Sequence, residues 1–244
     1  MRHKWRLAAA MAVATSACGP SLDRAPGRPS PGSVVPRPDS VTAFAQLYAA
    51  NCAGCHGSEG RGGAALALAD PVYLAIADDD AIRRVIHDGV SGTGMPPFAQ
   101  SAGGMLTDAQ VDAIVRGIRA WSNPGALGDA APPPRADRSP GDANRGALVY
   151  AAFCASCHGA TGHGGERASS IVDGSFLALV SDQYLRTIVI TGRPELGAPD
   201  WRGNVPGRPM TARDVGDVVA WLAAKRAAIP GQPYPARAAI GAAP

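Results

Sequence analysis

Two domains of about 80–100 residues with linkers account for the 244-residue chain better than one small domain does. Hydrophobic residues make up 46% of the chain but aromatic residues only 5%, so few large side chains are available to fill a core, and large flat cofactors would supply the missing volume. The formal charge is +3, but without Arg2, Lys4 and Arg6 the remaining 20 bases balance the 20 acids. No basic stripe indicates nucleic-acid binding.

The N-terminal residues 1–17 are predicted to form an export signal. Arg2, Lys4 and Arg6 make a basic region, and an apolar run of eleven residues follows at 7–17. This run is too short for a membrane-spanning helix, which needs about 20 residues. No later stretch comes close to that length, so we predict no membrane-spanning segment.

Cys18 is the predicted lipid anchor. It follows the small residues Thr15-Ser16-Ala17, which resemble a bacterial lipoprotein signal, although Thr15 stands where such signals usually have leucine. Cleavage near Ala17 without lipidation, leaving a free thiol, is the alternative. Residues 18–40 are rich in proline and are predicted to be a tether that reaches on the order of 60 Å. The predicted location is the periplasmic side of a bacterial membrane, or the soluble periplasm if Cys18 carries no lipid.

Two segments of the chain repeat each other. Cys52-Ala-Gly-Cys55-His56 matches Cys154-Ala-Ser-Cys157-His158 at an offset of 102, and residues 78–98 then match residues 181–201 without a gap. Such self-similarity predicts a duplicated domain. The predicted parts are domains at 41–123 and 142–229, a Pro-rich linker at 124–141 and a disordered tail at 230–244.

Each repeat is predicted to hold three main helices. The first runs into the Cys-x-x-Cys-His motif, over about 41–55 and 143–157. The second begins near an acidic or serine cap and ends at a glycine, and the third begins at a threonine and has spaced apolar positions. The caps are near Asp79 and Ser181 and at Thr107 and Thr211, and the glycines are Gly89 and Gly192. No segment indicates a strand, so the fold class is all-α.

The two Cys-x-x-Cys-His motifs predict covalent attachment of haem c. Two thiols three positions apart lie on one side of a helical turn and can form thioethers with one haem, while the next residue brings an imidazole to the iron. The rival interpretations are a redox dithiol and a zinc site. Each copy has its own histidine and Gly-rich loop, and export favours thioether chemistry. We therefore predict two haems, held by Cys52 and Cys55 with His56 and by Cys154 and Cys157 with His158.

With these motifs, the repeats resemble class I cytochromes c over about 41–122 and 142–229. The resemblance implies two tandem all-α domains, each with its last helix packed across its first. It also implies a second iron ligand, usually a methionine in the loop before the last helix. Met95, in Gly94-Met95-Pro96-Pro97-Phe98, fits that place 39 residues after His56. Packing of Met95 against the haem and ligation by Met105 are the alternatives. A His/Met pair tends to raise the reduction potential.

The second repeat departs from this pattern. The gapless alignment places Ala198 where Met95 stands, and alanine cannot bind iron. Met210, which aligns with Leu106, is the remaining methionine of the repeat and is the predicted ligand. An open or water-bound iron is the first alternative, and another ligand such as His163 is the second.

Electron transfer is the predicted function, because the cofactor carries the chemistry and no substrate motif is evident. The expected partners are redox proteins of a respiratory or photosynthetic chain: a quinol-oxidising complex, a reaction centre or a terminal oxidase. The chain is predicted to be an electron carrier rather than an enzyme. The alternative is a haem enzyme or small-ligand-binding cytochrome, similar to a peroxidase, that uses an open second iron. A scaffold subunit is a third possibility.

Overall fold

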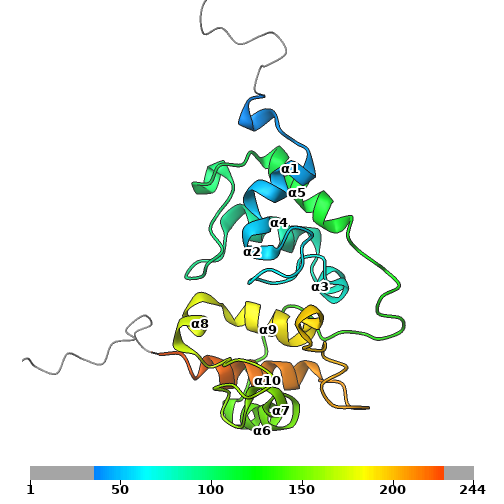
Figure 1. The fold of residues 1–244 in the computed structure, drawn as a ribbon, viewed down its shortest axis with the longest axis vertical. Coiled ribbons are helices and arrows are strands. Elements are labelled where there is room, and N and C mark those ends of the chain that lie inside the picture. Colours follow the sequence, from blue (N-terminus) through cyan, green and yellow to red (C-terminus); the bar gives the residue numbers. More distant parts are fainter. Residues whose placement is uncertain (1–35, 228–244) are drawn as a thin grey trace, which may run out of the picture. The chain divides into compact units, whose positions relative to one another are not determined.

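The computed structural model describes residues 36–227 of the chain (Figure 1). The predicted export signal, the predicted anchor Cys18 and the predicted tail at 230–244 lie outside these residues. The chain divides into two compact units, Met1–Arg37 and Pro38–Pro244, and every helix described below belongs to the second unit. Among the described residues, no helix has both the length and the apolar character needed to cross a bilayer.

Helices occur in the same order in the two repeats (Figure 1). The first repeat holds η1 (Pro38–Ser40), α1 (Phe44–Asn51), α2 (Ala53–His56), α3 (Pro71–Ile76), α4 (Asp79–Asp88), η2 (Gln100–Ala102) and α5 (Asp108–Arg119). The second holds α6 (Ala143–Phe153), α7 (Ala155–His158), α8 (Gly174–Leu179), α9 (Asp182–Thr191), η3 (Pro194–Leu196) and α10 (Ala212–Ala223). Within residues 36–227 there are isolated bridges but no strand, and the predicted all-α fold class is confirmed.

The helix starts follow the capping residues that the sequence offers. Thr107 and Gln110 form a reciprocal capping box at the start of α5, and Thr211 and Asp214 do the same for α10. The hydroxyl of Ser181 accepts a hydrogen bond from a backbone N–H in the first turn of α9. The predicted starts of the middle and last helices therefore agree with the structure.

The predicted first helix is interrupted in both repeats. Cys52 separates α1 from α2, and Cys154 separates α6 from α7. The helical hydrogen bonding continues up to this break, because the Cys52 N–H still donates to the Tyr48 carbonyl at 2.8 Å. Each motif thus begins at the end of one helix and finishes within a single following turn.

Each repeat has its own apolar core around its last helix. The predicted apolar stripes of α5 and α10 are buried. Their side chains are Val111, Ile114, Val115 and Ile118 in α5, and Val215, Val218, Val219 and Leu222 in α10. Burying this stripe against the first helix fixes the helix that leads into the haem motif.

The crossing of the first and last helices uses a glycine in both repeats, but on opposite helices. Gly117 of α5 faces the ring of Phe44, and Gly146 of α6 faces the backbone carbonyl of Asp217. In the repeat, Phe44 aligns with Gly146 and Gly117 aligns with Asp217. In the first repeat the glycine lies on the last helix and faces a ring from the first helix, whereas in the second repeat it lies on the first helix and faces the backbone of the last helix.

The reversal also changes the aromatic packing. In the first repeat Phe44 stands beside Tyr48 and Trp121, and the Tyr48 and Trp121 rings meet edge to face at 5.1 Å. In the second repeat, where Gly146 replaces the phenylalanine, Tyr150 and Trp221 stack at 4.2 Å. Loss of one ring thus lets the other two lie flat against each other.

Asp217 is a buried carboxylate at the α6–α10 crossing. Its side chain is 5% exposed, accepts two hydrogen bonds from Arg145, at 2.8 and 2.9 Å, and accepts the Asp142 N–H at 2.7 Å. The hydrogen bonds from Arg145 hold the pKa of Asp217 below its usual value, although burial opposes this. The pair therefore stabilises the fold at pH values above the unfolded pKa of about 3.9, and this contribution is lost as the pH falls through the folded pKa.

Asp217→Asn is expected to lower the free energy of unfolding at neutral pH. Because Arg145 is 44% exposed and screened by solvent, we expect a loss of about 1 kcal/mol and a fall in Tm of about 2–4 °C. Thermal melts of the haem-loaded protein at pH 7 and pH 3.5 measure this, and the difference between variant and wild type must shrink at the lower pH. Asp182→Asn, at a surface pair with Arg226, is the control and should change Tm little. Equal losses in the two variants would contradict the buried-pair explanation.

Candidate haem-binding sites

The four motif cysteines present free thiols. Cys55 is exposed, and Cys52, Cys154 and Cys157 are partly exposed. Burial raises the pKa of the Cys52 thiol to about 11, with a further rise from Cys55, and the Cys154 thiol behaves in the same way beside Cys157. A redox dithiol needs the opposite, a lowered pKa that yields thiolate. The environment therefore favours protonated thiols that are available for covalent attachment.

The motif histidines are held in one tautomer. His56 Nδ1 lies 2.7 Å from the Leu66 carbonyl oxygen, and His158 Nδ1 lies 2.8 Å from the Ser169 carbonyl oxygen. A carbonyl oxygen only accepts, so Nδ1 must carry the proton and Nε2 keeps its lone pair. Burial lowers the pKa of His56, which keeps the ring neutral. A neutral imidazole oriented through Nδ1 is the form that binds a metal.

This donor set fits haem c in each repeat: two thiols and, one residue later, an imidazole with a free Nε2. In residues 36–227 no group of three or more His, Cys, Asp or Glu side chains gathers in a metal-binding arrangement. The two motifs therefore do not meet as one four-cysteine zinc site. When bound, haem supplies a reversible one-electron Fe(III)/Fe(II) couple, and the protein sets its ligands and surroundings.

The loop that carries Met95 is ordered by its own backbone. Helix α4 ends at Gly89, whose φ of 65° leads into the loop, and the Val90 N–H donates to the Met95 carbonyl at 2.9 Å. The Met95 N–H donates to the Thr93 hydroxyl at 3.2 Å. Met95 is half-buried, whereas Met105 is 78% exposed. These positions favour Met95 over Met105 as the ligand of the first repeat.

The corresponding loop of the second repeat has the same register. Helix α9 ends at Gly192, also with a φ of 65°, and the Arg193 N–H donates to the Ala198 carbonyl at 2.9 Å. A Cβ on Gly89 would lie 2.7 Å from the Met95 carbonyl oxygen, and a Cβ on Gly192 would lie 2.6 Å from the Ala198 carbonyl oxygen. Ala198 thus occupies the backbone position of Met95.

Met210, the predicted second ligand, occupies the backbone position of Leu106. The Met210 N–H donates to the Trp201 carbonyl at 2.9 Å, and the Leu106 N–H donates to the Phe98 carbonyl at 2.7 Å. Met210 is 3% exposed and Leu106 is 5% exposed, each in the core of its repeat. Ligation by Met210 stays a prediction. His163, the other candidate, is exposed in the loop after α7.

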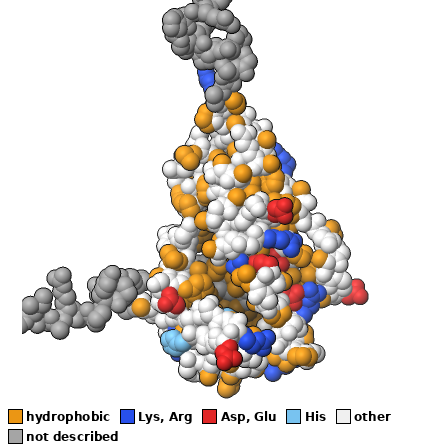
Figure 2. Space-filling view, in the orientation of Figure 1, with side chains coloured by type: hydrophobic (Ala, Val, Ile, Leu, Met, Phe, Trp, Pro, Cys, Tyr) orange, Lys and Arg blue, Asp and Glu red, His pale blue; other side chains and the backbone are white. Residues whose placement is uncertain are grey.

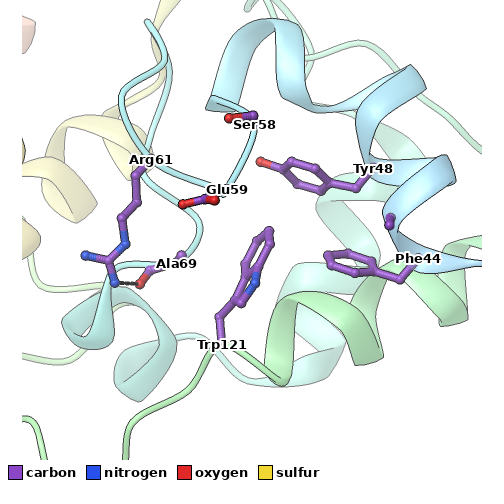
Figure 3. A pocket seen from close by; sticks show the side chains of 8 residues that line it. Phe44, Tyr48, Ser58, Glu59, Arg61, Ala69 and Trp121 are labelled. Carbon is purple, nitrogen blue, oxygen red and sulfur yellow. Dashed lines mark hydrogen bonds between the residues drawn. The ribbon is translucent and has the colours of Figure 1, made fainter.

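A cavity of about 450 Å³ lies between α1, the loop that follows the first motif and Trp121, and it was not predicted from the sequence (Figure 3). The rings of Phe44, Tyr48 and Trp121 form one side, and Arg61, which donates to the Ala69 carbonyl at 2.5 Å, closes another. Neither the motif cysteines nor His56 nor Met95 line it. Tyr48 and Trp121 recur in the second repeat as Tyr150 and Trp221, which is visible in the sequence. That Tyr48 and Trp121 line one cavity is visible only in the structure.

Contacts join the two repeats inside the second compact unit. Arg193, from the Ala198 loop, donates to the Gly63 carbonyl at 2.7 Å, in the loop that follows the first motif. Val72 of α3 packs among the core residues of the second repeat. On the face drawn in Figure 2, basic and acidic side chains are interspersed among apolar ones rather than gathered in a single stripe.

Helical modules that each present a Cys-x-x-Cys-His motif with a fixed histidine define a c-type cytochrome. The family described as cytochrome c oxidase, cbb3-type, subunit III matches residues 39–116 and 141–222, once on each repeat. These matches span more than half of the chain, and the chain belongs to this family. The predicted tandem arrangement of cytochrome c domains is thereby confirmed.

Two curated relatives carry related names. The chain is 30% identical over 179 residues to the cbb3-type cytochrome c oxidase subunit FixPc of Rhizobium leguminosarum bv. viciae, covering 68% of this chain and 56% of the relative. It is 31% identical over 134 residues to FixP of Sinorhizobium medicae (strain WSM419), covering 51% and 41%. The chain thus spans about half the length of these relatives. A solved structure, the Kuenenia stuttgartiensis reducing HAO-like protein complex, matches 79% of this chain and all of its own at 19% identity and a TM-score of 0.40.

Proposed function

We propose that the chain binds two haem c groups and passes electrons between them and to redox proteins. The observation that carries the proposal is the pair of motif histidines, each held by a backbone carbonyl so that Nε2 is free for iron. Cys52 and Cys55 attach the first haem, and Cys154 and Cys157 attach the second. Met95 would supply the second protein ligand of the first iron.

The partner proposed here is a terminal oxidase of the cbb3 type. Support comes from the family and from the relatives, which are named as subunits of such oxidases. A quinol-oxidising complex is the corresponding electron donor, and a reaction centre is an alternative partner. The contact between Arg193 and the Gly63 loop supports transfer within the chain, because it joins the loops next to the two haem sites.

The proposed location is the periplasmic side of a bacterial membrane, with Cys18 as the lipid anchor. The basic and apolar residues at 1–17 and the position of Cys18 after Thr15-Ser16-Ala17 support this. Mass spectrometry of the exported protein tests it, since a diacylglyceryl group on Cys18 supports the anchor and a free thiol contradicts it.

A pyridine haemochrome assay of the exported protein tests the haem proposal. We expect two c-type haems per chain, resistant to acid–acetone extraction because they are bound through thioethers. A reductive titration should then consume one electron per haem. One haem or none, or zinc in place of iron on metal analysis, would contradict the proposal.

A further inference from the structure

The second repeat has the same loop that carries Met95 in the first repeat, but alanine stands in place of the methionine. The Gly89 and Gly192 turns are alike, and the first loop residue after each donates to the carbonyl of Met95 or Ala198 at 2.9 Å. The position that carries a thioether in the first loop therefore carries a methyl group in the second.

The second loop is fixed so that this position does not shift. Arg193 and Ala198 exchange both backbone hydrogen bonds, at 2.9 and 3.1 Å, and the short helix η3 fills the turn between them. Beyond the loop, Trp201 is 3% exposed, and its N–H donates to the Ile190 carbonyl at 3.0 Å. With both ends held, a neighbouring residue does not slide into the place of Ala198.

Met210 is a buried core residue of the second repeat rather than a residue of the Ala198 loop. Its side chain is buried in the core, and its N–H is bound to the Trp201 carbonyl. The next residue, Thr211, caps α10. Leu106 holds the equivalent backbone position in the first repeat, where Met95 is the proposed ligand, so Met210 stands where the first repeat places a core side chain.

His163 lies in the loop that directly follows the second motif. It stands in a tight loop in which the Gly164 N–H donates to the His158 carbonyl at 3.0 Å. Because this short loop ties His163 to the backbone of His158, we do not assign His163 as the second ligand of the same iron. It is also exposed rather than directed inward.

We propose that the second haem has no side-chain ligand opposite His158, and that this position takes a small neutral molecule of the carbon monoxide or nitric oxide class. The inference rests on the proposed function, because it requires haem in the second repeat. The size follows from the side-chain difference, since alanine lacks the CH₂–S–CH₃ group of methionine. Neutrality is inferred from the loop itself, where Arg193 is paired with Glu195 at 2.5 Å and so offers little net charge to an anion.

Two measurements on the full-length holoprotein test the proposal. Near-infrared magnetic circular dichroism counts the sulfur-to-iron charge-transfer bands, and carbon monoxide titration of the reduced protein counts open irons. We expect one such band per chain and carbon monoxide bound to half of the haem. Ala198→Met should add a second band and abolish carbon monoxide binding, because it restores the thioether at a position already held by the loop.

Two matched variants test which methionine produces the sulfur-to-iron band. Met95→Ala should remove the single band and double the carbon monoxide bound, and Met210→Leu should leave both readings as in the wild type. Two bands in the wild type, one of them lost in Met210→Leu, would overturn the proposal and assign Met210 as the ligand. Absence of carbon monoxide binding in Met210→Leu would overturn it as well. The haemochrome count is taken first for every variant, so that loss of haem is not mistaken for a change of ligand.

Discussion

Replacing Cys154 and Cys157 together with serine is expected to halve the covalently bound haem while leaving the first haem intact. Each motif holds its own pair of thiols and its own histidine, and each repeat has its own apolar core. Serine cannot form the thioether, so the second haem should be lost to extraction. The haemochrome assay after acid–acetone extraction measures this, with one haem expected per chain.

The matched control replaces Cys52 and Cys55 in the same way. The remaining haem should then be the second, so this variant should lose the sulfur-to-iron band that the Cys154/Cys157 variant keeps. The pair of variants thus separates the haem count from the assignment of Met95. Retention of two extraction-resistant haems in either variant would contradict attachment through these motifs.

The fold was largely predictable because its main helices carry strong local signals. Threonine caps precede α5 and α10, and Gly89 and Gly192 end the middle helices with positive φ. The helices α3 and α8 were not predicted, although Asp70 and Asp173 cap their first turns. Six residues are too few to display a period of 3.6, so such turns are visible only once the chain has packed.

The residues of the candidate sites could be predicted from the sequence, but the backbone contacts that hold them in place could not. The spacing of Cys52, Cys55 and His56 is local and has a single strong interpretation. The carbonyl that fixes His56, from Leu66, comes from a loop with no sequence pattern, and any residue can offer a carbonyl. The alignment of Ala198 with Met95 could be made from the sequence, because the two repeats align without a gap over this region. Its meaning depended on the backbone contacts that hold the loop.

The glycines at the two helix crossings show why the alignment of the repeats could not predict tertiary contacts. Gly117 and Gly146 lie on different helices, so no position-by-position comparison pairs them. Each is explained by the residue it faces: the Phe44 ring for Gly117 and the Asp217 backbone for Gly146. Since a ring can move and a helix backbone cannot without moving the helix, the two glycines should differ in their tolerance of a side chain.

Gly146→Ala is therefore expected to destabilise the second repeat far more than Gly117→Ala destabilises the first. A Cβ on Gly146 would lie 2.0 Å from the Asp217 carbonyl oxygen and 2.8 Å from the Trp221 Cβ, so α6 must separate from α10. Overpacking of this kind costs about 1–3 kcal/mol, and forced separation of two backbones belongs at the upper end even after the gain of about 1 kcal/mol in helix propensity. We expect a net loss of about 2 kcal/mol and a Tm lower by about 4–8 °C.

The Gly117→Ala variant provides the comparison, because the nearest atoms to its new Cβ belong to the Phe44 ring, with Cδ2 at 2.0 Å. That ring is half-buried and can turn toward solvent, so the clash and the gain in helix propensity should nearly cancel, leaving a change within about 1 kcal/mol. Thermal melts of the two holoproteins measure the difference. Because α6 leads directly into Cys154, the Gly146→Ala protein should also perturb the second haem before the first. Equal Tm values for the two variants would mean that the α6 and α10 backbones are not in close contact.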